Sequence, residues 1–494
     1  MIKILILVIT TFIVVGCGSS TVSENVLDDV NTSEETVNES NTTDEPIADE
    51  PIISYSPIDI ENGKKEFLNN CATCHGSDAK GKTGPNIVGI SSNDIENEIK
   101  ANSAMVFLQG VILEGEARVI SIYLNELKKL DNSDDPTVIE KGLLGKELYF
   151  DANLSLNRTI SCASCHDAEH AYIDARFESN PVNGALSVGD DGVTLGGRNS
   201  PTVAYAKFIP DLFEFEDGSF IGGQFWDGRA DNLKEQAKGP FTDSAEMMMP
   251  DAQSVVARVY ENEAYVKTLQ KLYGDTIFSD TEKAFDAIAD AISKYEMTEE
   301  FAPFDSKYDR SKLPYYHVDH YEMTEQEKLG YSLFFSDKTH CRKCHTTSSE
   351  TESSIETFTN SNYENIGVPK NIEALIYRDG NSSSIDLGLG GVLNRPEHYG
   401  KFKVPTLRNV AVTSPYMSNG VFKELKTVIK YFLYMAGHDY PVNPETGEPW
   451  QAADVNSTIN HETLKTLPNL TEEEIDALES FLRLLTDKKY EDLF

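Results

Sequence analysis

Residues 162–166 read Cys-Ala-Ser-Cys-His, and the same Cys-x-x-Cys-His pattern occurs twice more in the chain. This spacing is the attachment signature of c-type haem, in which both thiols are bound covalently and the adjacent histidine reaches the iron. The three copies are Cys71-Ala72-Thr73-Cys74-His75, Cys162-Ala163-Ser164-Cys165-His166 and Cys341-Arg342-Lys343-Cys344-His345. The chain is therefore predicted to carry three covalently bound haem c groups, with His75, His166 and His345 as iron ligands.

The cysteine count supports this prediction. Of the seven cysteines, six lie in the three motifs, and Cys17 is the only other one, so none is left for a disulfide. The alternative for a Cys-x-x-Cys pair is a zinc site or a thioredoxin-like redox pair. Histidine follows all three pairs and no second Cys/His pair completes a tetrahedral zinc site, which favours haem.

The N-terminus has the pattern of an export signal. Lys3 precedes an apolar stretch, residues 4–15, which is too short to span a bilayer as a helix. Residues 14–17 (Val-Val-Gly-Cys) resemble a bacterial lipobox, so Cys17 is the predicted lipidation site; an ordinary cleaved signal is the alternative. We expect an exported lipoprotein on the periplasmic side, and Gly18 favours the outer membrane. No later segment is apolar for long enough to cross a membrane.

Charge and composition separate a tether from a folded body. Residues 18–55 are rich in Ser, Thr, Asn, Asp and Glu and nearly lack aromatic residues, which predicts a flexible acidic linker. The whole chain carries a formal net charge of -38. This charge argues against nucleic-acid binding and predicts that a docking protein presents a basic face.

The haem motifs divide the body into three predicted domains, which span residues 56–130, 137–320 and 321–494. Before each motif, a predicted helix carries a glycine four residues ahead of an aromatic residue; the pairs are Gly63/Phe67, Gly145/Tyr149 and Gly330/Phe334. Strand patterns are scarce, so the predicted fold class is mainly α, with three cytochrome c-like haem domains.

The second and third domains share further features. Pro201-Thr202 has a counterpart in Pro405-Thr406, and Gly228 with Leu233 is matched by Gly420 with Leu425, each pair opening a helix at the same offset. We interpret this as an internal duplication. Thr324-Glu325-Gln326-Glu327 and Thr471-Glu472-Glu473-Glu474 have the sequence of capped helix starts.

From about residue 143 to 485, the chain resembles the bacterial di-haem cytochrome c peroxidases and their relatives of the MauG type. Residues 56–130 resemble a small class I cytochrome c, and the whole is similar to three-haem peroxidases, some of which accept electrons from quinol. The resemblance rests on the segments 145–151, 161–166, 198–202, 225–230, 235–240, 246–247, 365–369, 402–409 and 413–416.

The resemblance implies that His166 is the proximal ligand of the peroxidatic haem. It places Glu246 as the group that moves a proton between the peroxide oxygens, and Gln236 as a polar residue of the distal pocket. Many family members carry a further histidine where this chain has residues 182–186, and it is absent here. His170 lies too close to His166 for that role, so the resemblance predicts a five-coordinate peroxidatic iron at rest.

Two further features follow from the resemblance. Trp226 matches the residue that lies between the two core haems and could relay electrons, although a buried tryptophan is more often part of a core. Asn199, with the backbone carbonyls of Thr413 and Pro415, matches a calcium site, and oxygen ligands suit that ion.

The sixth ligands of the other two haems are left open. His345 would hold the electron-transfer haem, for which a methionine sixth ligand gives a high potential. Met435 is preferred, with Met417 as the second choice, and Tyr431 or Tyr434 as a MauG-like tyrosine ligand. For the N-terminal haem the expected sixth ligand is Met105.

The predicted function is the reduction of hydrogen peroxide to water. Electrons from quinol or a small cytochrome c would enter at the N-terminal haem and pass through the His345 haem to the His166 haem. A MauG-type oxidase of a protein or small molecule and a non-catalytic multihaem electron carrier are the alternatives. Whether the protein is a homodimer is left open.

Overall fold

The computed structural model describes residues 136–347 and 356–494, together with scattered positions between residues 65 and 124. The predicted lipidation site Cys17, the acidic segment 18–55, and Cys74, His75 and Met105 lie outside the described residues. Around the first haem motif, Phe67 and Cys71 are buried. The Cys71 amide donates to the Phe67 carbonyl at 2.8 Å, as at the end of the helix predicted before that motif.

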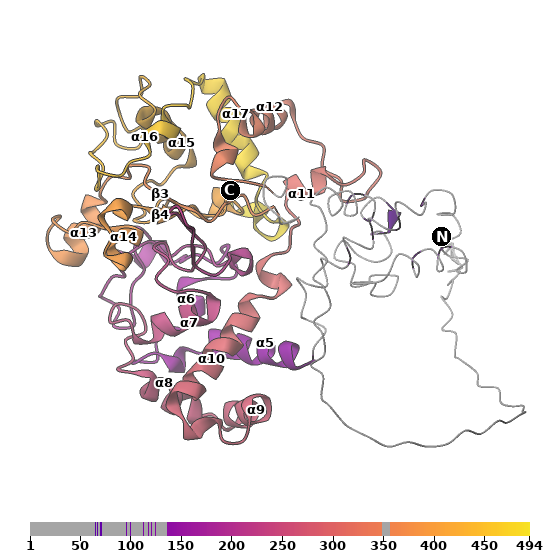
Figure 1. Ribbon diagram of the computed structural model, residues 1–494, viewed down its shortest axis with the longest axis vertical. Helices are drawn as coiled ribbons and strands as arrows, with labels where there is room; N and C mark the ends of the chain where they lie inside the picture. The colour runs from indigo at the N-terminus through magenta and orange to yellow at the C-terminus, as the bar shows by residue number, and fades with distance from the viewer. Residues whose placement is uncertain are drawn as a thin grey trace, which may run out of the picture. The chain divides into compact units, whose positions relative to one another are not determined.

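The described part of the chain is built mainly of helices (Figure 1). The α-helices are α5 (Pro136–Tyr149), α6 (Cys162–Cys165), α7 (Leu233–Thr242), α8 (Ala252–Tyr260), α9 (Glu263–Tyr273), α10 (Thr281–Glu296), α11 (Lys307–Ser311), α12 (Glu325–Phe335), α13 (Ile372–Asp379), α14 (Gly388–Leu393), α15 (Leu425–Met435), α16 (His461–Leu464) and α17 (Glu472–Arg483). Short 3-10 helices are η3 (Ala152–Leu154), η4 (Phe177–Ser179), η5 (Ala206–Phe208), η6 (Ile277–Ser279), η7 (Glu299–Phe301), η8 (Cys341–Lys343), η9 (Pro396–His398), η10 (Val410–Val412) and η11 (Lys488–Leu493).

Strands are few and short. β1 (Phe213–Glu214) pairs with β2 (Phe220–Ile221), and β3 (Tyr363–Glu364) pairs with β4 (Phe402–Lys403), both antiparallel. The mainly α prediction is therefore confirmed, while the count of three haem domains stays a prediction. Within the described ranges, no helix combines the length and apolar character needed to span a bilayer.

The first half of the described region is centred on α5 and α10. A Cβ atom on Gly145 of α5 would lie 1.9 Å from the Ala291 carbonyl oxygen of α10, so only glycine permits this crossing. One helical turn later, Tyr149 is fully buried and packs edge-to-face against Tyr295 and Phe301. The recurrent glycine therefore serves a close helix–helix contact, and the aromatic residue serves the core beside it.

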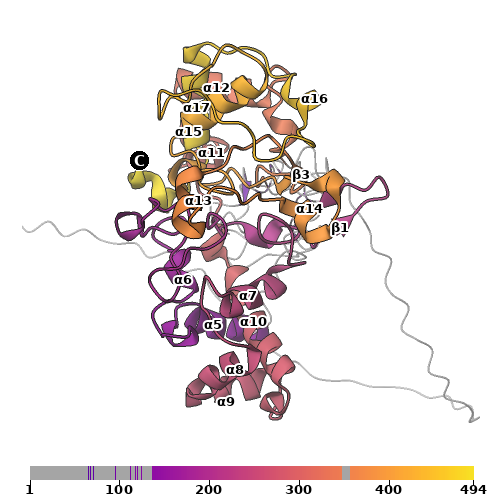
Figure 2. The ribbon, with the colours of Figure 1, turned by 90° about the vertical axis from the view of Figure 1, so that its left-hand side faces the viewer.

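The second half repeats this crossing with α12 and α17. A Cβ atom on Gly330 would lie 1.9 Å from the Ala477 carbonyl oxygen, and Phe334 packs against Phe358 and Phe481. Both of these helices begin with the predicted capping boxes. Figures 1 and 2 show α5, α7, α8, α9 and α10 together in one half, and α12, α15, α16 and α17 together in the other.

The loops that follow the haem motifs also repeat. Thr202 Oγ1 donates to the Ala171 carbonyl at 2.6 Å, and Thr406 Oγ1 donates to the Thr357 carbonyl at 2.5 Å. Three residues after each threonine, the backbone adopts a left-handed conformation, at Tyr205 (φ 63°) and at Asn409 (φ 62°). α7 and α15 begin at the predicted positions Leu233 and Leu425. The internal duplication is thus confirmed in three dimensions.

Candidate active site

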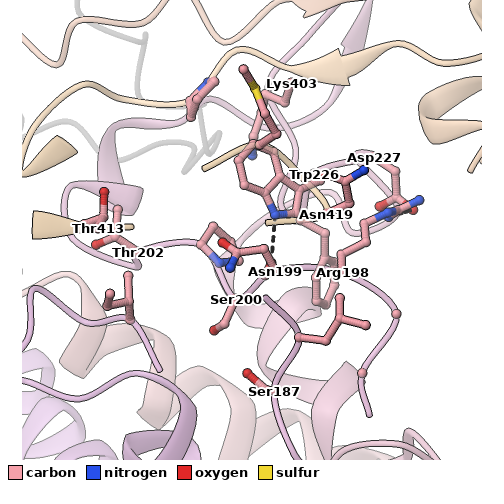
Figure 3. Close-up of a pocket in the computed structure, with 18 of the residues that line it drawn as sticks. Ser187, Arg198, Asn199, Ser200, Thr202, Trp226, Asp227, Lys403, Thr413 and Asn419 are labelled. Atoms are coloured by element: carbon pink, nitrogen blue, oxygen red, sulfur yellow. Dashed lines mark hydrogen bonds and ion pairs between the residues drawn. The ribbon is translucent and has the colours of Figure 1, made fainter. Parts of the chain in front are cut away.

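A cavity of about 610 Å³ lies where the two halves meet (Figure 3). His166, Gln236 and Glu246 line it from the first half, and Pro405 and Thr413 line it from the second. The structure thus brings together the predicted peroxidatic ligand, the predicted proton carrier and the predicted distal amide. These residues are up to 80 positions apart in the sequence.

The motif at the cavity is folded as a single helical turn. The His166 amide donates to the Cys162 carbonyl at 3.0 Å, and Tyr149 donates its hydroxyl hydrogen to the His166 carbonyl at 3.2 Å. His166 Nδ1 lies 3.1 Å from the Tyr172 carbonyl oxygen, so Nδ1 carries the hydrogen and donates. Burial lowers the pKa of His166 and keeps the imidazole neutral. Its Nε2 lone pair is therefore free to bind a metal.

The motif of the second half repeats this arrangement. His345 Nδ1 lies 3.0 Å from the Phe358 carbonyl oxygen, and burial lowers the pKa of His345 to about 4. A backbone carbonyl therefore orients each imidazole and fixes the same tautomer in both. In that tautomer Nδ1 carries the hydrogen and Nε2 can bind iron.

The four cysteines of these two motifs fit thioether formation better than metal binding. Cys162, Cys165, Cys341 and Cys344 form no disulfide. A tetrahedral zinc site would need further Cys or His ligands close to each pair. Across residues 136–347 and 356–494, no group of three His, Cys, Asp or Glu side chains could hold a metal ion. The thiol pairs and the neutral histidines together suit haem c.

Glu246 lies on the cavity wall in the loop after α7. Its backbone carbonyl accepts from the Asp190 amide at 2.9 Å, and its own amide donates to the Asp243 carbonyl at 3.2 Å. Burial, together with the charge of Asp243 and against the opposing charge of Arg229, raises the pKa of Glu246 to about 7. A carboxyl with a pKa near neutrality can both accept and return a proton at physiological pH.

α7 supplies two other groups to the cavity. Gln236 and Pro240 lie one helical turn apart, and both line the cavity. The helix is started by Asn232, whose side chain accepts from the Glu235 amide at 3.2 Å. Sequence reasoning found Gln236 but missed Pro240, although the one-turn spacing between them could have indicated it.

Sequence reasoning also missed Asp190. Its buried carboxylate accepts from Ser155 Oγ and Thr159 Oγ1, each at 2.6 Å, and from the Asn157 amide. The same residue donates its amide to Glu246. Asp190 therefore ties the Glu246 loop to the segment that leads into the haem motif, a link that only the folded chain reveals.

Trp226 joins the two halves at the cavity (Figure 3). Its indole Nε1 donates to the Asn199 carbonyl at 2.9 Å, and its own carbonyl accepts from the Lys403 amide of β4 at 2.8 Å. Asn199, Thr413 and Pro415, the residues of the predicted calcium site, line the same cavity. The structure brings them together, and calcium binding stays a prediction.

The candidate sixth ligands of the His345 haem gather around one aromatic cluster of Phe422, Tyr431 and Trp450. Tyr431, Tyr434 and Met435 share a face of α15; the Tyr431 hydroxyl donates to the Gly367 carbonyl, and Tyr434 stacks on Trp450 with ring centroids 5.7 Å apart. Met417 packs against the same cluster and also lines the main cavity. The Tyr431 hydroxyl already has a buried partner, which leaves Tyr434 and Met435 as the candidates on this helix.

The position of the missing histidine is apolar. Val182, Ala185 and Leu186 form a small core cluster, and His170 pairs with Asp167 at 2.8 Å. Among the described residues that line the cavity, His166 is the only histidine.

Comparisons with known proteins agree with this geometry. A family model described as di-haem cytochrome c peroxidase matches residues 139–313, and one described as cytochrome c matches residues 60–118. The methylamine utilization protein MauG of Paracoccus denitrificans (strain Pd 1222) is 42% identical over 71% of this chain and 89% of that protein. This chain belongs to the di-haem cytochrome c peroxidase and MauG family. It is accordingly a haem c-binding oxidoreductase.

Other family members show the same likeness. The cytochrome c peroxidase Ccp of Escherichia coli (strain K12) is 30% identical over 62% of this chain and 56% of that protein. The crystal structure of the di-haem peroxidase BthA from Burkholderia thailandensis E264 superposes with a TM-score of 0.60 at 28% identity, covering 73% of this chain and 88% of that one. A MauG-like protein associated with microbial copper homeostasis gives a TM-score of 0.51 at 28% identity, covering 72% and 92%.

Proposed function

We propose that this family member is a three-haem peroxidase that reduces hydrogen peroxide to water. The observation that carries the proposal is the Glu246 carboxyl, which shares a cavity wall with His166 and has a pKa of about 7. Gln236 and Pro240 complete that wall. A bare electron carrier has no need of a half-buried carboxyl and an amide on one cavity wall.

The chain's own groups manage protons and position. Haem c held by Cys162, Cys165 and His166 would supply the redox chemistry that cleaves the O–O bond. Glu246 as carboxylate would accept a proton from one peroxide oxygen and return it to the other, which leaves as water. Gln236 donates a hydrogen bond to the bound peroxide. The overall reaction takes up two electrons and two further protons and yields two molecules of water.

The remaining features complete the proposal. The two electrons enter at the N-terminal domain, reach the His345 site and cross to the His166 site past Trp226. Calcium at Asn199, Thr413 and Pro415 would fix the junction that these electrons cross. Export, a lipid anchor at Cys17, and quinol or a small cytochrome c as donor belong to the same proposal. The apolar cluster at residues 182–186 supports an open iron site at rest.

A MauG-type oxidase is the second candidate. It is favoured by the 42% identity to a MauG protein and by the presence of Tyr434 on α15. Such an enzyme would draw electrons from a protein or small molecule through the same cavity. A spectrum of the His345 haem that lacks methionine ligation would favour this candidate.

Steady-state peroxide reduction by the haem-loaded protein with an artificial reductant tests the proposal. Replacing Glu246 by Gln keeps the shape but removes the proton acceptor, so turnover should fall about 10²–10⁴-fold. The matched control is Glu235→Gln, because the Glu235 carboxylate pairs with Lys238 and does not line the cavity. Wild-type protein that shows no turnover, even after pre-reduction and addition of calcium, would contradict the peroxidase.

A further inference from the structure

A buried carboxylate joins the two repeats. Asp487, near the end of the chain, accepts from the Tyr205 hydroxyl at 2.5 Å on Oδ1 and from Asn409 Nδ2 at 2.8 Å on Oδ2. Tyr205 and Asn409 are equivalent positions of the duplication, three residues after Thr202 and Thr406. All three members of this Tyr205–Asp487–Asn409 network are at most 2% exposed.

Tyr205 differs from Asn409 because it lines the cavity that also contains His166 and Glu246. Burial and the charge of Asp487 raise the pKa of Tyr205 well above its ordinary value, so the phenol is fully protonated at neutral pH. A phenol that is oxidised by one electron becomes strongly acidic. Tyr205 can therefore give up an electron only if a neighbouring group takes its proton.

Asp487 is suited to take that proton. Both of its oxygens accept hydrogen bonds, which fits the ionised form, and burial raises its pKa to about 7, so it is a stronger base than an ordinary carboxylate. The charged groups around the pair are Arg408, whose guanidinium lies 5.4 Å from the centre of the Tyr205 ring, Asp305 beside Asp487, and Asp309 beside Tyr205. Arg408 is itself paired with Asp309 at 2.6 Å.

The other tyrosine of the cavity wall lacks such an acceptor. Tyr416 also lines the cavity, but its hydroxyl donates to the Val410 carbonyl at 3.0 Å. A peptide carbonyl cannot hold a proton at neutral pH. The two tyrosines thus share the cavity and differ in whether proton loss is possible.

We propose that Tyr205 is a redox-active residue of this protein and that Asp487 is its proton acceptor. The inference rests on the proposed reaction with hydrogen peroxide, which serves as the oxidant. One molecule of peroxide takes up two electrons and two protons from the solvent and becomes two molecules of water. When no external donor is present, Tyr205 supplies one of these electrons, and haem c bound to the chain would supply the other. As Tyr205 is oxidised, its O–H bond breaks, its electron passes to the His166 site, and its proton goes to the Asp487 carboxylate. The products are a neutral phenoxyl radical and a protonated carboxyl group.

When peroxide has reacted and no external donor is present, such a site would place the resulting radical on Tyr205. Tyr205 packs edge-to-face on Phe304 with ring centroids 4.8 Å apart, and Arg408 contacts both rings together with Phe358, whose carbonyl holds His345. These contacts link Tyr205 to the backbone segment that holds His345, by a route separate from Trp226.

Electron paramagnetic resonance of the haem-loaded protein, frozen after mixing with peroxide without reductant, tests the inference. The wild type should show an organic-radical signal that narrows when the protein contains ring-deuterated tyrosine. Tyr205→Phe should lose this signal, while the matched variant Tyr416→Phe should keep it. Asp487→Asn should lose it as well, because an amide cannot accept the proton.

The outcomes separate this inference from the proposed function. Peroxide turnover in the wild type together with a tyrosyl signal that persists in Tyr205→Phe, or with no tyrosyl signal at all, overturns the inference and leaves the peroxidase intact. A wild type that does not react with peroxide overturns the proposed function first. If Asp487→Asn fails to load haem, the comparison of Tyr205→Phe with Tyr416→Phe decides the question, because neither change removes a charged side chain.

Discussion

The two repeats of the described region use one scaffold for different local chemistry. Each has a glycine-mediated helix crossing, a haem motif and a histidine whose Nδ1 donates to a backbone carbonyl. The repeats diverge on the helix that begins at Leu233 or Leu425. Gln236 of α7 faces the shared cavity, whereas its counterpart on α15 is Val428, in an apolar cluster. The duplicated scaffold thus repeats the haem motif and its oriented histidine, whereas the residues predicted to handle protons lie on α7 and in the loop after it, in the first repeat.

The helix crossings should respond alike to substitution. Gly145→Ala and Gly330→Ala each place a methyl group against a backbone carbonyl. Because the clashing atom belongs to the backbone, a change of side-chain rotamer cannot remove the clash. Each change should cost about 1–3 kcal/mol in free energy of unfolding, measured by denaturant titration.

Gly142→Ala is the matched control on α5, because its Cβ would meet the Lys294 carbonyl oxygen at an ordinary 3.5 Å. There the better helix propensity of alanine should stabilise the protein by up to about 1 kcal/mol. If Gly142→Ala and Gly145→Ala changed the free energy of unfolding by similar amounts, the close helix contact at Gly145 would not be what requires glycine.

A second test concerns a difference at equivalent positions. Five residues after the crossing carbonyls of Ala291 and Ala477 stand Glu296 and Leu482, both buried. The Glu296 Oε2 atom has no hydrogen-bond partner within the described ranges, and burial raises its pKa to about 8 from 4.5. The folded state therefore disfavours ionisation of Glu296. The contribution of the protonated Glu296 side chain to the free energy of unfolding is fully present below pH 4.5 and is lost as the pH rises through 8.

Glu296→Leu copies the second repeat and should remove this loss. The variant should exceed the wild type by about 1–3 kcal/mol at pH 9 and by little or nothing at pH 4.5, measured by thermal unfolding across that range. A gain that does not depend on pH would show that packing, and not the charge, sets the difference between the repeats.

The smallest expected effect is on the pH dependence of peroxide reduction in the first repeat. Because Glu246 must be ionised to accept a proton, kcat/KM should rise through about pH 7. Arg229 lowers this pKa and Asp243 raises it. Arg229→Ala should therefore move the midpoint to higher pH and Asp243→Asn to lower pH, each by under about one unit. Midpoints that move in the same direction would exclude Glu246 as the titrating group.

Much of this architecture could be predicted from the sequence. The haem motifs, the helix starts at Thr324 and Thr471 and the duplication are local patterns, and the structure confirms the last two directly. The resemblance to a known family located Glu246 and Gln236, and the structure places both on one cavity.

The parts that escaped prediction depend on contacts between distant segments. Tyr205 and Asp487 are separated by 282 positions, and Asp190 reaches Ser155 and Glu246 in opposite directions along the chain. An acidic residue in so acidic a chain carries no local sign of burial. The choice of sixth ligand beside His345 also exceeds what spacing can decide, because Tyr434 and Met435 are adjacent on α15.

The shared carboxylate of Asp487 has an evolutionary consequence. After a duplication, two copies usually become free to vary separately, but here Tyr205 of one copy and Asn409 of the other bind opposite oxygens of one side chain. A change at any of these three positions alters the environment of the other two. The halves should therefore vary together at this network among relatives, even where their remaining loops have drifted apart.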